Sequence, residues 1–187
     1  YDYLNNEILF TFLQENNDFT ISYNELKQQF ISFYDYTPSM YISIGDMLLS
    51  TNTTLRSLYE HGVGEYNTFY GIKYPSYITF NLNPEPYFDC VFDNINYKSE
   101  VYLNNIDQPD VTLTDIQAYN DYQSTLLTPL VNNRNGNLRR RFRDWNAEIP
   151  RDGRNRIRGP WIKLKVQFNN QSNYKLILHD MIISYTV

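Results

Sequence analysis

The residues with the most distinctive chemistry are nine arginines that lie between Arg134 and Arg158. The chain has only sixteen Lys and Arg residues and a formal net charge of -5, so positive charge gathers in one segment of an acidic protein. No lysine lies in this segment, and guanidinium groups make planar, bidentate contacts with carboxylate or phosphate. The candidate site comprises eight of these arginines and one tryptophan: Arg139, Arg140, Arg141, Arg143, Trp145, Arg151, Arg154, Arg156 and Arg158.

Three interpretations of this arginine segment remain open. It forms an internal network of salt bridges with the protein's own acids, an interface with an acidic neighbouring subunit, or a contact with packaged or passing nucleic acid. The acidic remainder of the chain disfavours general nucleic-acid binding, which depends on neutralising many phosphates. We therefore expect a segment that binds carboxylates, in its own domain or in the next subunit.

The same segment has the features of a folded structure rather than of a disordered basic arm. The stretch "IPRDG" supplies a turn with Pro and Gly in its middle. Apolar residues that we expect to anchor it in a core interrupt the positive charge: Phe142, Trp145, Ile149 and Pro150.

Motifs for other chemistry are absent from the sequence. It has no zinc-ligand spacing, phosphate-binding glycine loop, dinucleotide fingerprint or G-x-S-x-G elbow. The single cysteine, Cys90, lies in the apolar run "YFDCVF", which predicts a small buried residue. We expect structural roles for His61 and His179, and no catalytic residue, metal site or cofactor. No apolar run approaches the roughly 20 residues that a membrane-spanning helix needs, so we expect no membrane anchor.

The composition predicts an all-β protein. The chain has 18 Tyr and 11 Phe, which favour strands, and 23 Asn, which favour turns. In "WIKLKVQF" the apolar residues from Ile162 to Phe168 alternate with polar ones, as in a strand with one buried face. In "YKLILHDMIISYTV" the apolar phase changes near His179–Asp180, which predicts a β-bulge there.

Residues 1–75 and residues 76–187 differ in their sequence patterns. Residues 1–75 alternate short β-like runs with tight turns, such as Gly45–Asp46 in "TPSMYISIGDMLLST", and this suits the last blade or blades of a propeller. No clean internal repeat supports that interpretation. Prolines from Pro75 onward mark a boundary, and the strands of residues 76–187, spaced by Asn, Asp and Pro, suggest a β-sandwich that includes the arginine segment. The expected fold is part of a β-propeller followed by a β-sandwich.

The end of the chain also resembles a known family. "RRRFRDWNAEIPRDGRNRIRGPWIKLKVQF" followed by "KLILHDMIISYTV" resembles the C-terminal end of tail nozzle proteins of crAss-like, short-tailed phages. These are also called muzzle or packaged-DNA stabilisation proteins. Upstream, "FISFYDYTPSMYISIGDMLLST" looks like their last blade region, so the resemblance covers most of the chain.

The resemblance implies a structural role in the tail of the virion. It implies a ring of subunits, expected to be a hexamer, that closes the distal end of the tail channel and retains DNA or cargo until infection. Its implied partners are copies of itself, the N-terminal remainder of the same polypeptide, other tail proteins, and DNA or cargo in transient contact. Such proteins are much longer, and the chain begins with Tyr1 rather than Met, so we expect a C-terminal fragment.

Two other functions remain as alternatives. The aromatic content of 17% allows a carbohydrate-binding β-sandwich module of a phage or secreted protein, with Tyr and Trp as stacking platforms. A glycan-cleaving tail enzyme would require carboxylates that cluster in a pocket, which a sequence does not display.

Overall fold

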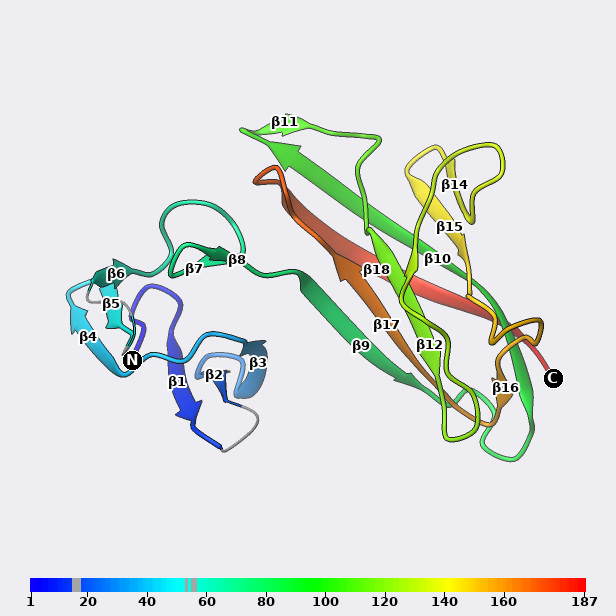
Figure 1. The fold of residues 1–187 in the computed structure, drawn as a ribbon, viewed down its shortest axis with the longest axis horizontal. Coiled ribbons are helices and arrows are strands. Elements are labelled where there is room, and N and C mark those ends of the chain that lie inside the picture. Colours follow the sequence, from blue (N-terminus) through cyan, green and yellow to red (C-terminus); the bar gives the residue numbers. More distant parts are fainter. Residues whose placement is uncertain (15–17, 53, 55–56) are drawn as a thin grey trace. The chain divides into compact units, whose positions relative to one another are not determined.

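The computed structural model describes residues 1–14, 18–52, 54 and 57–187. All regular elements of these residues are strands, β1 to β18 (Figure 1), which confirms the all-β expectation. The chain divides into two compact units, Tyr1–Tyr74 and Pro75–Val187.

The described residues of unit 1, Tyr1–Tyr74, form three small antiparallel sheets. The predicted turn at Gly45–Asp46 joins two of its strands, and Gly45 has a φ of 57°, a conformation that glycine adopts without a steric penalty. The sheets consist of β1 (Glu7–Phe12), β2 (Phe19–Asn24) and β3 (Gln29–Tyr34); β4 (Met40–Ile44), β5 (Met47–Thr51) and β6 (Leu58–Glu60); and β7 (Thr68–Phe69) and β8 (Ile72–Lys73).

The interior of unit 1 combines aromatic rings with hydrogen-bonded polar groups. Tyr36 is 4% exposed, and its ring centroid lies 4.3 Å from that of Phe69. The Ser50 hydroxyl lies 2.6 Å from Nε2 of His61 and 2.7 Å from the Tyr70 hydroxyl. Burial lowers the pKa of His61, which favours the neutral ring. This packed environment agrees with the structural role expected for His61.

Unit 2, Pro75–Val187, contains two larger antiparallel sheets, and the first is built around β10 (Cys90–Leu103). One edge of β10 pairs with β18 (Lys175–Thr186) over most of its length. Its other edge pairs in turn with β16, β15 and β11, and β14 extends the sheet beyond β15. These shorter strands are β11 (Ile106–Asp107), β14 (Leu138–Arg141), β15 (Asp144–Glu148) and β16 (Arg158–Gly159).

The second sheet of unit 2 packs its inner face against the first. One buried cluster contains Phe92, Ile95 and Tyr97 of β10 together with Leu164 of β17 and Ile116 of β12. Along β17, buried and half-buried residues alternate from Ile162 to Phe168, as the sequence predicted. The strands of this sheet, in order, are β13 (Thr128–Pro129), β12 (Asp115–Tyr119), β17 (Ile162–Phe168) and β9 (Ser76–Leu82).

The predicted bulge in the last strand is confirmed. Lys98 of β10 pairs with Asp180, but the next residue, Ser99, pairs with Leu178, so His179 is the extra residue. Leu176 and Leu178 on one side of it, and Met181 and Ile183 on the other, pack against the core. The bulge therefore brings two apolar runs of opposite phase to one face.

Leu164→Ala should lower the free energy of unfolding of unit 2 by about 2–5 kcal/mol, because Leu164 is fully buried and truncation leaves a cavity. Urea denaturation followed by tryptophan fluorescence measures this, since Trp145 and Trp161 both lie in unit 2. Leu126→Ala is the matched control, because Leu126 is 87% exposed and should change stability by less than about 0.5 kcal/mol. Equal effects of the two substitutions would contradict the placement of the core.

Candidate functional site

The eight candidate arginines lie in two surface segments at opposite ends of β15. One is the β14–β15 hairpin, and the other is the segment 150–158 that follows β15. All eight residues are exposed, whereas Trp145 in β15 is 2% exposed and belongs to the core. The hairpin carries Arg139, Arg140, Arg141 and Arg143, and the following segment carries Arg151, Arg154, Arg156 and Arg158.

Arg139 binds the backbone of its own loop. Its Nη1 donates to the carbonyl oxygens of Asn133 and Gly136, both at 2.7 Å, and its Nη2 donates to that of Arg134 at 3.2 Å. The loop is tight, because a Cβ built on Gly136 would lie 1.8 Å from the carbonyl oxygen of Val131. Arg139 thus closes a loop that only glycine permits at position 136.

Arg140 and Arg156 pair with acids of unit 2. Nη1 of Arg140 lies 3.0 Å from Oδ1 of Asp110, and its guanidinium carbon lies 5.6 Å from the Trp145 ring centroid. Nη1 of Arg156 lies 2.6 Å from Oδ1 of Asp93. In each pair one side chain is largely exposed, at 85% for Asp110 and 55% for Arg156, and surface pairs contribute roughly 0–1 kcal/mol each. They position the two segments more than they stabilise the fold.

The remaining five arginines make no side-chain hydrogen bond or ion pair with any residue that the structure describes. Arg143 lies in the field of Glu100, whose pKa is lowered chiefly by a hydrogen bond from the Tyr102 hydroxyl and to a smaller extent by His179 and Arg143. An internal network of salt bridges therefore does not account for most of the segment. The five are Arg141, Arg143, Arg151, Arg154 and Arg158.

Phe142 corrects one expectation, since it does not anchor the segment in a core. It is 86% exposed and has a φ of 58° at the tip of the β14–β15 hairpin. Arg141 and Asp144 form the last pair of the hairpin, so Phe142 and Arg143 make its turn and project beyond the sheet. Ile149, at 6% exposure, and Trp145 are buried as expected.

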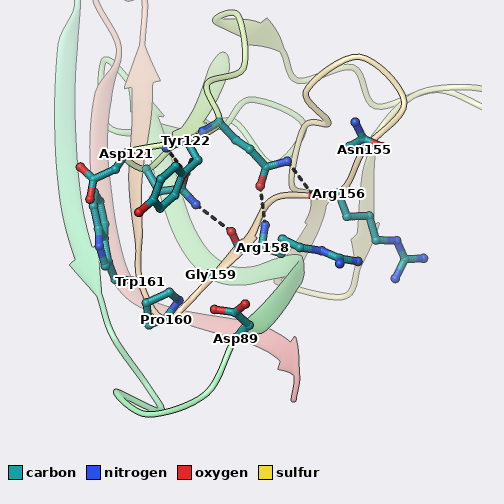
Figure 2. A pocket seen from close by; sticks show the side chains of 11 residues that line it. Asp89, Asp121, Tyr122, Asn155, Arg156, Arg158, Gly159, Pro160 and Trp161 are labelled. Atoms are coloured by element: carbon teal, nitrogen blue, oxygen red, sulfur yellow. Dashed lines mark hydrogen bonds between the residues drawn. The ribbon is translucent and has the colours of Figure 1, made fainter.

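A pocket that the sequence did not reveal lies beside the second arginine segment (Figure 2), with a volume of about 660 Å³. Side-chain amides of the 120–123 turn hold its two walls together. Nδ2 of Asn120 donates to the carbonyl oxygen of Arg158 at 2.9 Å, and Nε2 of Gln123 donates to that of Arg156 at 3.1 Å. The lining comes from three separate stretches of chain: Asp89; Asn120, Asp121, Tyr122 and Gln123; and Asn155, Arg156, Arg158, Gly159, Pro160 and Trp161.

A second hollow of about 450 Å³ lies between β10, the hairpin and the bulge of β18, and it holds His179. Nε2 of His179 lies 3.5 Å from Oε2 of Glu100, which also accepts a hydrogen bond of 2.9 Å from the Tyr102 hydroxyl. The bulge places His179 at this surface, away from the core. The contact with Glu100 fits the structural role expected for this histidine.

Within the described ranges, no three or more His, Cys, Asp or Glu residues come together in a group that could hold a metal ion. Cys90 is buried and fully inaccessible, as its apolar surroundings predicted. The described part of the chain contains no helix of the length and apolarity needed to cross a membrane.

Comparison with known proteins decides the family. The family model of the crassvirus muzzle protein matches residues 1–54. The family model of the crassvirus muzzle protein C-terminal domain matches residues 64–152. The chain belongs to the crassvirus muzzle protein family. The muzzle protein of Bacteroides phage crAss001 is 31% identical over 192 residues, which cover 99% of this chain. The chain spans about 13% of the length of that relative.

The family assignment confirms the resemblance found in the sequence. The match to the muzzle C-terminal domain includes the β14–β15 hairpin and Arg151, but ends before Arg154. The hairpin arginines therefore lie in the part of the chain that matches the muzzle family model.

Arg139→Ala should lower the stability of unit 2 by roughly 1 kcal/mol, because the loop carbonyl groups lose their charged donor. Arg141→Ala, on the same strand, removes an arginine without a side-chain partner among the described residues and should change stability by less than about 0.5 kcal/mol. Urea denaturation of both variants measures the difference. A larger loss for Arg141→Ala would show that it has an internal partner after all.

Proposed function

We propose that the chain is a structural component of a phage virion and that its copies form a ring, a hexamer, at the distal end of the tail. The ring closes the tail channel and retains DNA or cargo until infection. The observation that carries this proposal is membership in the muzzle family, with a phage muzzle protein matching 99% of the chain. Membership in that family favours a structural over a catalytic role.

In this proposal unit 1 is part of a β-propeller that the N-terminal remainder of the same polypeptide completes. Propeller blades usually have four strands, whereas the sheets formed by the described residues of unit 1 have two or three. Unit 1 also exposes large apolar side chains, including Phe12 at 44%, Phe30 at 60% and Phe33 at 69%. Apolar surface of this extent marks a face that another protein segment covers.

Unit 2 is a β-sandwich in the same proposal, because its two antiparallel sheets share one core. Its outer surface carries the unpaired arginines. The sandwich is thus the rigid support that presents them to other chains of the tail.

The unpaired arginines form the interface with the next copy in the ring. Their acidic partner is unit 1 of that copy, because residues 1–74 contain nine Asp and Glu but only three Lys and Arg, a formal charge of -6. A contact between two different surfaces of identical chains is heterologous, and it generates a ring when the rotation closes. Arg141 and Arg143 flank the exposed Phe142, so this tip offers both an apolar contact and two cations.

Contact with other tail proteins, DNA or cargo is a smaller part of the proposal. Residues 75–187 contain 13 Lys and Arg and 12 Asp and Glu, so unit 2 is nearly neutral overall. A nearly neutral surface with local positive charge suits brief contact with a passing polyanion rather than tight binding.

Cryo-electron microscopy of particles of the phage that encodes this chain tests the proposed location and assembly. We expect symmetric density for unit 2 at the distal end of the tail, with several copies around the channel. Particles that lack the chain, or a chain recovered only as a free monomer, would overturn the proposal.

The double variant Arg141→Ala/Arg143→Ala should weaken ring assembly more than it weakens folding. Removing one partner of a buried interfacial charge pair costs roughly 2–5 kcal/mol, so rings should dissociate at lower salt. Electron microscopy of particles over a salt series measures the fraction of complete rings. Arg156→Ala is the control, because Arg156 pairs with Asp93 of its own unit. Equal ring stability in the double variant and the wild type would contradict the proposed interface.

A further inference from the structure

We propose that the pocket beside residues 155–161 binds a neutral saccharide. This site shares Arg158 with the arginine segment, and all of its lining residues belong to unit 2. Its volume of about 660 Å³ lies within the range of small-ligand pockets, about 300–1,000 Å³. The ligand class follows from the aromatic rings, the rigid frame and the polar groups of the lining.

Two aromatic rings offer apolar surface for the C–H face of a sugar ring. The Tyr122 side chain is 90% exposed although it projects from a well-held turn. Figure 2 shows Tyr122, Asp121 and Trp161 together along one side of the pocket. Nζ of Lys163 lies 5.9 Å from the Trp161 ring centroid and supports that ring. Flat, rigid aromatic rings of this kind contribute a large apolar contact area to a ligand.

The frame of the pocket is formed before any ligand arrives. The Asn120 side-chain oxygen accepts hydrogen bonds from the backbone N–H groups of Tyr122 at 2.9 Å and Gln123 at 2.8 Å. The Gln123 side-chain oxygen accepts one from the backbone N–H of Arg158 at 2.9 Å. These amides are engaged in holding the turn, so the backbone of Tyr122 is fixed while its ring projects into solvent. A preformed site loses little conformational entropy on binding.

Gly159 allows the two walls to approach each other this closely. Its φ is 150°, and an added Cβ would lie 3.2 Å from Nδ2 of Asn120, the atom that donates to the Arg158 carbonyl. A larger residue would push the 120–123 turn away from the segment of Arg158. The close contact therefore belongs to the construction of the pocket.

The polar lining matches a ligand with hydroxyl groups and no net charge. Asp89 and Asp121 supply two carboxylates, Arg158 supplies one free guanidinium group, and the guanidinium of Arg156 is already paired with Asp93. Carboxylates accept hydrogen bonds from hydroxyl groups, and the free Arg158 guanidinium donates in pairs to neighbouring oxygens. Because Asp93 neutralises Arg156, the two carboxylates outnumber the one free guanidinium group, which disfavours the phosphates of a nucleic acid.

Heteronuclear NMR of the 187-residue chain tests the site with maltose, lactose, cellobiose and mannobiose as probes. We expect at least one disaccharide to shift the Trp161 indole and Tyr122 amide signals saturably, with a dissociation constant in the millimolar range. Tyr122→Ala should weaken that binding roughly tenfold, since it removes the exposed ring. Tyr87→Ala is the matched control, because Tyr87 is 94% exposed and does not line the pocket.

Three results would overturn the inference. They are the absence of saturable shifts with all four disaccharides, unchanged affinity in Tyr122→Ala, and binding that requires an acidic sugar such as sialyllactose. The spectra of Tyr122→Ala also report whether the variant is folded. Because the probes are free sugars and the site lies within unit 2, failure of ring assembly would leave this result unaffected.

Discussion

Unit 2 depends on the pairing of β10 along both of its edges. This strand of 14 residues binds β18 on one side and three short strands on the other, while its side chains enter the shared core. Of the three short strands, β11 follows β10 through a tight turn, whereas β15 and β16 come from more distant parts of the chain, and β10 aligns them. The arginine hairpin follows from this alignment, because β15 pairs directly with β10 and β14 pairs with β15.

Each of the two register shifts in the β10–β18 pairing places a polar residue at the surface. At Asp93 the register shifts, and the Asp93 side chain then binds Arg156 at 2.6 Å and Thr186 at 3.3 Å. At His179 the bulge keeps apolar residues on the core face and turns a histidine toward Glu100. Each shift adds one polar residue that has no paired residue on the opposite strand, as in β-bulges generally.

The arginines of the segment make different contacts, although they are the same residue type. Arg139 closes a loop, and Arg140 and Arg156 hold the two segments to acids of unit 2. In the segment of Arg156 to Arg158, the backbone forms a wall of the saccharide pocket, while the side chains carry the charge (Figure 2). One stretch of chain thus supports two neighbouring surfaces with different chemistry, and the unpaired arginines are available to an acidic partner.

Local patterns in the sequence were enough to predict the strands with clear alternation, the β18 bulge and the burial of Cys90, because burial in a sheet alternates with a period of two. Arginine without lysine indicated carboxylate binding, and the end of the chain indicated the family. The partners of individual arginines, the exposure of Phe142 and the pocket at Tyr122 were beyond reach of such patterns. They depend on contacts between residues far apart in the chain, such as Arg156 with Asp93 and Gln123 with Arg158. Periodicity specifies which face of a strand is apolar, whereas the register between strands decides which polar groups meet, and that register is a property of the whole fold.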